Sequence, residues 1–293
     1  MNKNRNIHSA FSLIELSIVI LIIGILIAGI TQGSALISKF RLATAKAVTQ
    51  SSPVNSIKNL ILWLEPTTDD SFTNASSSKE VSDGDLISSW NDINPQATFK
   101  TNFTQATADN QPTYKTKGIN GIPSLSFNGT SSMLNSTSTL IPNGASSYTI
   151  FIVFQSTSLA TQVIFAQNGV NCTGEYVGVF TTSLRVNGWG CGTFGDTDAF
   201  SFRLNTPTFV AYRVDGSQTN NVLIYSNNNS YGPFARALSV NGVNMVIGAG
   251  NRNPYLYWLN GFLSEIIIFD RALKTDEITS IRDYLIKKYS ITS

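Results

Sequence analysis

The sequence Ala10-Phe11-Ser12-Leu13-Ile14-Glu15 leads directly into residues 16–30, which are almost wholly apolar. A short leader precedes it and carries Lys3 and Arg5 but no acidic residue. Glu15 is the anomaly, because a bare carboxylate is costly inside hydrocarbon and by default marks a functional site. The position of this carboxylate, near the start of an apolar run, is the feature around which the rest of the chain is organised.

The leader, the Phe and the Glu, in register ahead of the apolar run, resemble the signal of type IV prepilins and pseudopilins. The resemblance implies that a prepilin peptidase/N-methyltransferase cuts between Ala10 and Phe11 and methylates the new amine of Phe11. It also implies that Glu15 neutralises that amine on a neighbouring pilin or pseudopilin subunit during assembly. A charge paired inside a helix bundle costs far less than one that faces lipid. The family usually has Gly before the cut, where this chain has Ala10.

Two other interpretations of this stretch stay open. An ordinary secretory signal would be cleaved after the apolar run, and residues 33–35 offer small side chains for such a site. A plain membrane anchor is the other, although it would not need Glu15. Basic residues flank both ends of the run, so the positive-inside count is ambiguous. The resemblance alone implies a single pass of the inner membrane before assembly, with the C-terminal domain periplasmic or extracellular, and a place on the pilus or cell surface afterwards.

Residues 11–50 are predicted to form one long helix, because the first proline of the chain is Pro53. The first half of this helix is apolar all round, as a transmembrane segment is, and the second half is amphipathic. Serine and asparagine cluster around Pro53 and end the helix. We therefore divide the chain into a leader (1–10), a transmembrane and assembly helix (11–50), a linker (51–58) and a C-terminal domain (59–293).

After the linker, short β-rich runs alternate with turn clusters. Some of these runs alternate apolar and polar residues, while others, such as residues 148–154, are apolar throughout and should be buried. So many short strands predict a mostly β fold, an antiparallel two-sheet sandwich. One helix closes the chain, with Thr275 as its expected N-cap and Ile278, Ile281 and Leu285 as its apolar stripe. Trp63 and Trp90 are expected in the core.

Five segments carry a second resemblance. They are residues 60–64, 83–92, 111–114, 120–129 and 261–273. Their order is similar to that of bacterial concanavalin A-like, laminin-G-like domains of lectins and glucanases. The resemblance covers about residues 59–291 and implies a jelly-roll β-sandwich with a C-terminal helix.

The composition argues against several classes of function. The single histidine, His8, is in the leader, so a processed chain has no Ser–His or Cys–His catalysis and no histidine-ligated metal. Loss of Lys3 and Arg5 lowers the number of basic residues from 20 to 18, which equals the 18 acidic residues. The mature chain therefore lacks the excess of basic residues that is typical of nucleic-acid-binding proteins. A glycosidase needs two carboxyls at a controlled separation, and no such pair occurs on a predicted strand. We therefore expect a protein that is not an enzyme.

Two cysteines and three aspartates are the candidates for covalent or metal links. Cys172 and Cys191 are an even pair in a chain predicted to lie outside the cytoplasm, so we expect a disulfide. Two buried free thiols are the alternative. No cofactor is required, but calcium fits sandwiches of this type, and Asp196, Asp198 and Asp215 could supply oxygens. The alternative, which we favour, is that these three residues are ordinary turn aspartates without a bound metal.

Aromatic residues in two loops are candidate ligand-binding residues. Trp189 and Phe194 lie in a glycine-rich segment, residues 187–195, and a second cluster consists of Tyr255, Tyr257 and Trp258. Aromatic faces stack on sugar rings and anchor protein interfaces, so the partner would be a carbohydrate or a host or envelope protein. The alternative is that these rings fill the core.

These features together predict a type IV pilin-like subunit, a minor one, that displays a lectin-like domain for adhesion or recognition at the cell surface. Its partners would be the membrane, the prepilin peptidase and other pilin subunits. One alternative is a pseudopilin of a type II-like secretion system that engages cargo or the envelope. A glycan-degrading enzyme is the less favoured alternative.

Overall fold

The structure is a computed structural model. It describes residues 13–142, 144, 146–169, 173–180, 183–188, 203–235, 244–250 and 255–292. The chain comprises two compact units, Met1–Arg41 and Leu42–Ser293.

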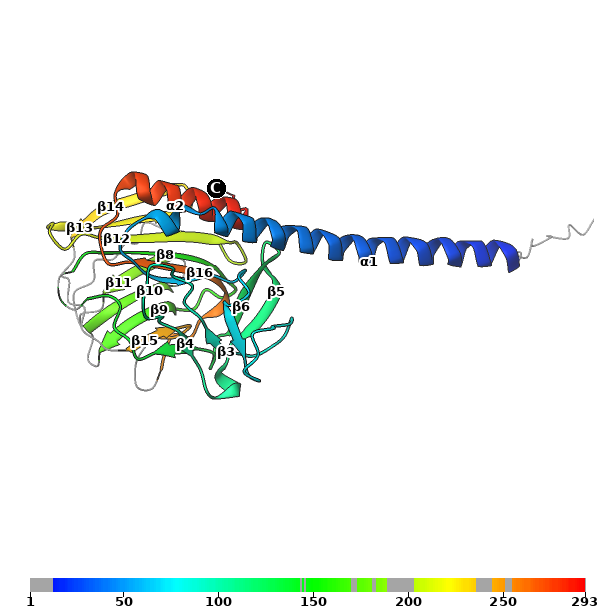
Figure 1. The fold of residues 1–293 in the computed structure, drawn as a ribbon, viewed down its shortest axis with the longest axis horizontal. Coiled ribbons are helices and arrows are strands. Elements are labelled where there is room, and N and C mark those ends of the chain that lie inside the picture. Colours follow the sequence, from blue (N-terminus) through cyan, green and yellow to red (C-terminus); the bar gives the residue numbers. More distant parts are fainter. Residues whose placement is uncertain are drawn as a thin grey trace, which may run out of the picture. The chain divides into compact units, whose positions relative to one another are not determined.

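The first unit is helical over its described residues. Helix α1 begins at Leu13 and ends at Gln50, so its last turns belong to the second unit (Figure 1). The large apolar side chains described between Ile14 and Ile27 are 47–68% exposed, and they occur at nearly every position of this stretch. Within the first unit these apolar side chains are therefore exposed on every side of the helix. Within the described residues, no helix is both long and apolar enough to span a bilayer.

In its described residues the second unit contains two sheets, two short 3-10 helices and a C-terminal α-helix. The 3-10 helices are Pro53–Ser56 and Ala108–Asn110, and α2 is Thr275–Tyr289. The strands are β1 Leu60–Leu64, β2 Phe72–Asn74, β3 Ile87–Trp90, β4 Phe103–Thr104, β5 Thr113–Ile119, β6 Ile122–Asn128, β7 Leu134–Ser136, β8 Tyr148–Ser156, β9 Gln162–Gly169, β10 Thr173–Phe180, β11 Ser183–Gly188, β12 Thr208–Val214, β13 Asn220–Ser226, β14 Asn229–Ala235, β15 Asn244–Ile247 and β16 Asn260–Phe269.

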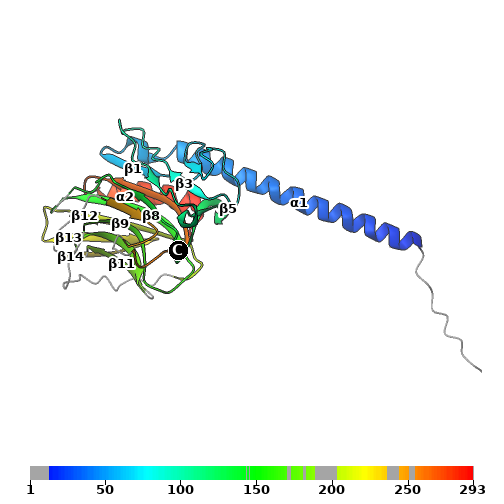
Figure 2. The same cartoon turned by 90° about the horizontal axis from the view of Figure 1, so that it is seen from below.

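Each sheet has eight strands, and every strand pair in the described residues is antiparallel. Sheet A has the order β14-β13-β12-β8-β16-β6-β5, and β1 pairs with β16 beside this path. Sheet B has the order β11-β10-β9-β15-β7-β4-β3-β2. Strands β14 and β5 form opposite edges of sheet A (Figure 2). The mostly β, antiparallel fold with a C-terminal helix, predicted from the short alternating runs, is confirmed.

Sheet A is covered on both faces, which explains its uninterrupted apolar strands. Strand β8 is buried along almost its whole length, as predicted for residues 148–154. Its side chains alternate between two cores: Ile150, Ile152 and Phe154 face sheet B, while Phe151 and Val153 face the helices. Strands that are apolar throughout are typical of parallel sheets, which are buried on both faces. Here an antiparallel sheet has such strands because helices cover its second face.

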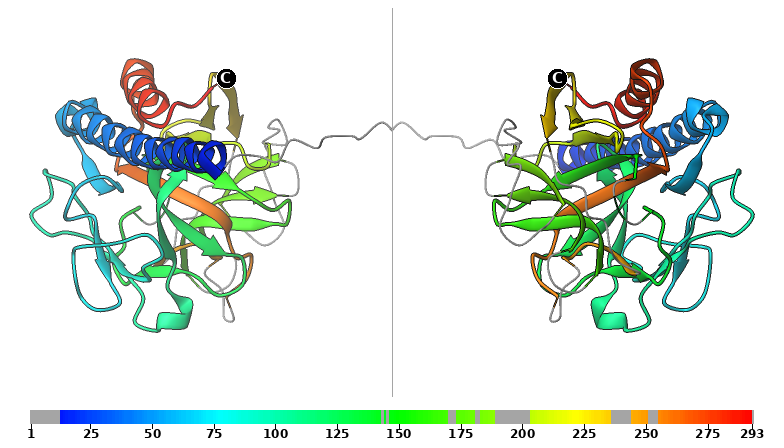
Figure 3. Two further views of the ribbon diagram at one scale, coloured as in Figure 1. Left: turned by 90° about the vertical axis from the view of Figure 1, so that its right-hand side faces the viewer. Right: turned by 90° about the vertical axis from the view of Figure 1, so that its left-hand side faces the viewer.

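Helix α2 and the last turns of α1 cover the outer face of sheet A (Figure 3). The predicted stripe of α2 is confirmed, because Ile278, Ile281 and Leu285 are at most 1% exposed. From α1, Ala45 is buried in the same cluster and Val48 packs against it. Residues 51–58, which we expected to be a linker, also pack here, since Val54 and Ile57 are buried.

The start of α2 differs from the prediction. The helix begins at Thr275, and its N-cap is Lys274 rather than Thr275. The carboxylate of Glu277 accepts the backbone N–H of Lys274 at 2.8 Å, and Arg271 holds that carboxylate from the other side at 2.6 and 2.8 Å. In this capping box the side chain of Glu277 reaches back to the backbone N–H of the N-cap residue, which places the cap one residue earlier than expected. These bonds from Arg271, with the Lys274 N–H, lower the pKa of Glu277 to about 2, despite burial.

Candidate functional site

Several predicted site residues lie outside the residues that the structure describes. They are the processing pair Ala10 and Phe11, the predicted disulfide Cys172–Cys191, the aromatic residues Trp189 and Phe194, and the acidic residues Asp196 and Asp198. Glu15 lies in the first turns of α1, but its side chain is not among those described. The predictions made for all these residues stand as predictions.

The second aromatic cluster is described, and it lies on the outer face of sheet B. Met245 and Ile247 of β15 point into the core between the sheets, so Val246, between them, points outward. Tyr255 and Trp258 pack on Val246 together with Met133 and Ala249. The two rings meet edge to face, with centroids 6.0 Å apart and planes at 61°.

Backbone contacts fix the segment that carries these rings. The backbone N–H of Val163 donates to the Tyr257 carbonyl at 2.7 Å, and the N–H of Gly250 donates to the Leu256 carbonyl at 2.7 Å. Tyr257 has a φ of 58°, a left-handed conformation that bulky residues rarely adopt. Its ring packs on Val163 and Ala166, which form a small cluster of their own on β9.

Tyr255, Tyr257 and Trp258 are all half-buried. They pack on two small clusters apart from the main core, and each ring gives up part of its surface to the sheet. The three rings are held in place and partly exposed, as are aromatic residues in many sugar-binding and protein-binding surfaces.

Asp215 occupies a turn and is already engaged. Arg213 donates to its Oδ2 at 3.0 Å, and the hydroxyl and N–H of Ser217 donate to its Oδ1 at 2.7 and 3.2 Å. The hydrogen bond from the Ser217 hydroxyl, helped by Arg213, holds the pKa of Asp215 below its usual value. Within the described residues no three His, Cys, Asp or Glu side chains gather as metal ligands. The geometry of Asp215 is that of a turn aspartate.

A buried charge cluster is the main feature that the sequence analysis missed. The ammonium group of Lys288 lies 2.8 Å from Glu65 Oε1 and 2.8 Å from Glu265 Oε2. All three side chains have no exposed surface. Glu65 directly follows β1, Glu265 is in β16, and Lys288 is in the last turn of α2. Two features of the sequence could have indicated this cluster: Glu65 directly follows the apolar run 60–64, and Glu265 interrupts the apolar run 262–269.

Aromatic donors surround Glu265. Trp63 Nε1 and the Tyr284 hydroxyl each donate to Glu265 Oε1 at 2.8 Å, and the Tyr289 hydroxyl donates to Oε2 at 2.9 Å. Burial and the nearby charge of Glu265 raise the pKa of both tyrosines well above their usual value, so both hydroxyls stay protonated donors. Every oxygen of this carboxylate is satisfied, as a buried charge requires.

Glu65 is satisfied by a different set of donors. The backbone N–H groups of Thr67 and Thr68 donate to its two oxygens at 2.6 and 3.0 Å, and the Thr67 hydroxyl also donates. Burial by itself raises the pKa of Glu65, but the attraction and hydrogen bond of Lys288, with those of Thr67, outweigh burial and lower it. The hydroxyl of Thr49, in the last turn of α1, lies 3.4 Å from the Tyr284 hydroxyl and 3.5 Å from Glu65. The cluster therefore joins the end of α1, β1, β16 and α2.

These two carboxylates do not form a glycosidase pair. A glycosidase needs both carboxyls accessible to the sugar on either side of the scissile bond. Glu65 and Glu265 are sealed beneath α2 and bridged by one lysine. The cluster is therefore part of the scaffold.

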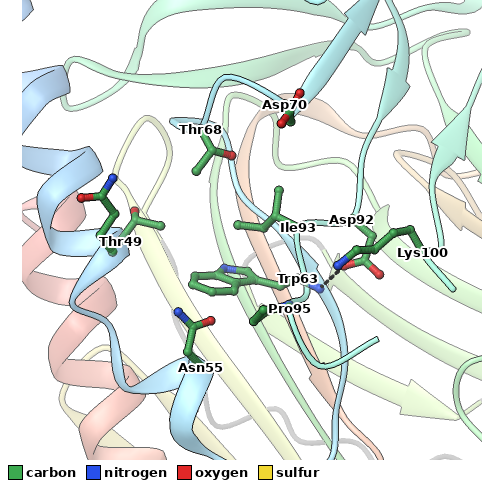
Figure 4. Close-up of a pocket in the computed structure, with 10 residues that line it drawn as sticks. Thr49, Asn55, Trp63, Thr68, Asp70, Asp92, Ile93, Pro95 and Lys100 are labelled. Atoms are coloured by element: carbon green, nitrogen blue, oxygen red, sulfur yellow. Dashed lines mark hydrogen bonds between the residues drawn. The ribbon is translucent and has the colours of Figure 1, made fainter. Parts of the chain in front are cut away.

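A pocket of about 440 Å³ opens beside this cluster, between the last turn of α1 and the sandwich (Figure 4). Figure 4 shows Trp63 among the lining residues, with Thr49 and Asn55 on one side and Asp92 and Lys100 on the other. Asp92 accepts the backbone N–H groups of Trp63 and Asn94 at 3.0 and 2.9 Å. Burial nevertheless raises the pKa of Asp92. With its carboxylate tied to backbone donors, Asp92 holds the loop beside Trp63 in place.

The comparisons with known proteins fall into two groups, one for the N-terminal segment and one for most of the chain. A family model described as the prokaryotic N-terminal methylation motif matches residues 5–31. No curated protein matches the chain. Among solved structures, a GH54 α-L-arabinofuranosidase soaked with a cyclic sulfate inhibitor has a TM-score of 0.53 at 12% identity, covering 70% of this chain and 52% of that one.

Two further solved structures match the chain. Trypanosoma rangeli sialidase in complex with 2,3-difluorosialic acid has a TM-score of 0.51 at 12% identity, covering 81% of this chain and 34% of that one. Domain 4 of AbnA, a GH43 extracellular arabinanase from Geobacillus stearothermophilus, has a TM-score of 0.48 at 15% identity, covering 76% of this chain and 98% of that one.

The chain spans about half of the arabinofuranosidase and a third of the sialidase. At such identities the likeness is one of fold. What the comparisons establish is a chain that carries the prokaryotic N-terminal methylation motif, the signature of type IV prepilins, ahead of a mostly antiparallel β unit.

Proposed function

We propose that the protein is a type IV pilin-like subunit that is cut and methylated at Phe11, assembles through α1, and presents a concanavalin A-like sandwich for recognition. The observation that carries the proposal is the methylation motif over residues 5–31, continuous with a helix whose described apolar side chains between Ile14 and Ile27 are exposed. Large exposed apolar surfaces mark sites of contact with a membrane or with other proteins. Here the membrane covers them before assembly and the helices of other pilin subunits cover them afterwards.

The close packing at the end of α1 supports presentation of a domain rather than a loose tether. Ala45 and Thr49 are buried against the sandwich, and Lys46 forms an ion pair with Asp69. Within the second unit, a pull on the last turns of α1 therefore acts directly on the core that contains β1, β16 and α2. A subunit that must hold a ligand under load benefits from this continuity.

Recognition is proposed to involve the aromatic surface formed by Tyr255, Tyr257 and Trp258. Its rings are pre-positioned and half accessible on the outer face of sheet B. The similar structures include an arabinofuranosidase complexed with arabinofuranosyl-α-1,2-xylobiose, with a TM-score of 0.52, 13% identity, and coverage of 70% of this chain and 52% of that one. A neutral carbohydrate is therefore the first ligand class to test, and we propose binding without catalysis.

We expect Trp258→Ala to weaken binding to neutral polysaccharides by about tenfold or more, because a stacking ring of this kind contributes of the order of 1–3 kcal/mol. The measurement is binding of the detergent-solubilised chain to a panel that includes arabinoxylan, arabinan and xylan. Phe99→Ala is the matched control, since Phe99 is 90% exposed and lies far from this surface in the sequence. Equal binding by the Trp258 variant, or no binding by the unaltered chain, would contradict carbohydrate recognition at this surface.

Processing is tested by changing the residue before the cut. We expect Ala10→Gly to be cleaved at least as well as the unaltered chain and Ala10→Leu to accumulate uncut, because the site accepts only a small side chain before Phe11. Mass spectrometry of the N-terminal peptide, in cells with and without the prepilin peptidase, measures both. Cleavage that is indifferent to residue 10 and to the peptidase would favour an ordinary secretory signal.

A further inference from the structure

Strand β5 carries a distorted segment at one edge of sheet A. Lys115 pairs with Ser124 of β6 and Ile119 pairs with Ile122, so residues 116–118 stand opposite the single residue Pro123. Insertions of this kind bend a strand and re-aim its side chains, and they are frequent beside functional sites. Here the distortion brings Thr116 and Lys117 out of the regular ladder.

Three contacts hold the distorted segment in one shape. The backbone N–H of Ile119 donates to the Ser124 hydroxyl at 3.0 Å. Gly118 lies so close to β6 that a Cβ there would come within 2.4 Å of the Ser124 side chain. On the other side, Asp83 Oδ1 accepts the N–H and the hydroxyl of Thr116 at 2.8 and 3.0 Å. The segment is therefore a built feature with a fixed geometry.

This segment forms one wall of a pocket of about 420 Å³. The pocket is lined by Asp83, Lys115, Thr116, Lys117 and Phe262. Lys115 is half-buried and Lys117 is exposed, and neither ammonium group has an ion-pair or hydrogen-bond partner among the described residues. Phe262, in β16, is half-buried and packs against the helix-side core of sheet A. Both lysines attract the Asp83 carboxylate electrostatically without an ion-pair contact, so the pocket combines two cations, one carboxylate and one partly exposed aromatic ring.

Asp83 adds a hydrogen-bond acceptor to the pocket. Only its Oδ1 is used by Thr116, which leaves Oδ2 as an acceptor without a partner in the described residues. A phosphodiester or a uniformly anionic surface offers no donor to this oxygen. A sugar ring with a carboxylate can satisfy both kinds of group, because its carboxylate can pair with the lysines and its hydroxyl groups can donate hydrogen bonds to Asp83.

We propose that this pocket binds an acidic saccharide, a sugar ring that carries a carboxylate. Lys115 and Lys117 bind the carboxylate, the apolar face of the ring packs on Phe262, and a ring hydroxyl donates to Asp83 Oδ2. The site is separate from the aromatic surface at Trp258, since Phe262 packs on the helix side of sheet A and Trp258 lies outside sheet B. The inference does not depend on processing or on filament assembly.

The test uses the full chain in detergent with three acidic polysaccharides: polygalacturonate, alginate and polysialic acid. Methyl-esterified polygalacturonate is the neutral match, polyglutamate is the acidic peptide match, and vesicles with phosphatidylserine represent an anionic lipid surface. Lys115→Gln with Lys117→Gln is the test variant. Lys58→Gln with Lys287→Gln removes the same charge from exposed positions elsewhere and is the control.

We expect one of the acidic polysaccharides to bind and its methyl ester or neutral counterpart not to bind. The Lys115/Lys117 variant should bind about tenfold more weakly or worse, while the control variant should bind normally. Asp83→Asn should weaken saccharide binding. Binding of polyglutamate or the vesicles as strongly as the saccharide would overturn the proposal. So would equal binding by both lysine double variants, or no binding to any of the three polysaccharides. If the Lys115/Lys117 variant aggregates but still binds, the lysines protect the sheet edge, and the proposal is also wrong.

Discussion

Lys288→Met should be among the most destabilising substitutions in the second unit, lowering the free energy of unfolding by about 3–5 kcal/mol. Lys288 is the single cation between Glu65 and Glu265, and all three side chains have no exposed surface. Methionine fills much of the same volume but leaves two carboxylates facing each other without solvent. Removing one member of a buried ion cluster leaves an uncompensated charge, which costs far more than the net contribution of the intact cluster.

The neighbouring Lys287 supplies the matched control. It is exposed in the same turn of α2, so Lys287→Met should change the free energy of unfolding by less than about 0.5 kcal/mol. Urea unfolding of the detergent-solubilised chain, followed by tryptophan fluorescence, measures both variants. The combination of Lys288→Met with Glu65→Gln and Glu265→Gln should recover much of the loss. Equal stability of the two single variants would mean that the cluster does not hold α2 on sheet A.

The same cluster predicts a pH dependence whose direction follows from Glu65. The pKa of Glu65 is lowered in the folded protein, against burial, by Lys288 and Thr67. A carboxyl with a lowered folded pKa adds stability that is present above its unfolded pKa and is lost as the pH falls through the folded one. The unaltered protein should therefore lose stability below about pH 4.5. The Lys288→Met variant should instead gain stability on acidification, because protonation removes the uncompensated charge.

Glu15→Ala should leave membrane insertion and cleavage normal but should largely abolish incorporation into filaments or pseudopilus complexes. A lone carboxylate near the end of an apolar helix can tilt toward the interface or become protonated, so its cost in the bilayer is of the order of a few kcal/mol. Pairing with the amine of a neighbouring Phe11 in a water-poor helix bundle removes that cost and fixes the axial register. The carboxylate should therefore matter little for insertion and greatly for assembly.

The measurement is the yield of sheared filaments or cross-linked complexes against the level in the membrane fraction, in cells that also make the major subunit. Glu15→Asp, one methylene shorter, should be intermediate. Ser17→Ala is the control in the same turn, because among the described residues the Ser17 hydroxyl donates to the Ile14 carbonyl of its own helix. Normal incorporation of the alanine variant would show that Glu15 is incidental to assembly.

The parts of the fold that follow from local pattern could be predicted from the sequence. Trp63 and Trp90 are buried as expected, and the stripe of α2 faces the core. Both outcomes follow from hydrophobic periodicity, a pattern that can be recognised within a few consecutive residues. The N-cap of α2 was placed one residue too late, because Lys274 takes that position and its N–H is held by Glu277 with help from Arg271, a residue outside the helix.

The site features that were missed depend on residues far apart in the sequence. Glu65, Glu265 and Lys288 each look like ordinary charges at the ends of apolar runs, and only the packing of α2 on sheet A brings them together. The Lys115/Lys117 pocket depends on a register shift between β5 and β6, which the alternation of Tyr114, Lys115 and Thr116 does not signal. The aromatic residues near Trp258 were found, but their placement on the outer face of sheet B was not.

The most direct test of the account is the N-terminus of the unaltered chain in the material sheared from cells. The account predicts a peptide that begins with N-methylated Phe11, recovered with other pilin subunits in the sheared filament fraction. Recovery of the same mature peptide only in the envelope would assign the chain to a secretion pseudopilus. A chain that begins at Met1, or after Gly33, would contradict the pilin-like assignment itself.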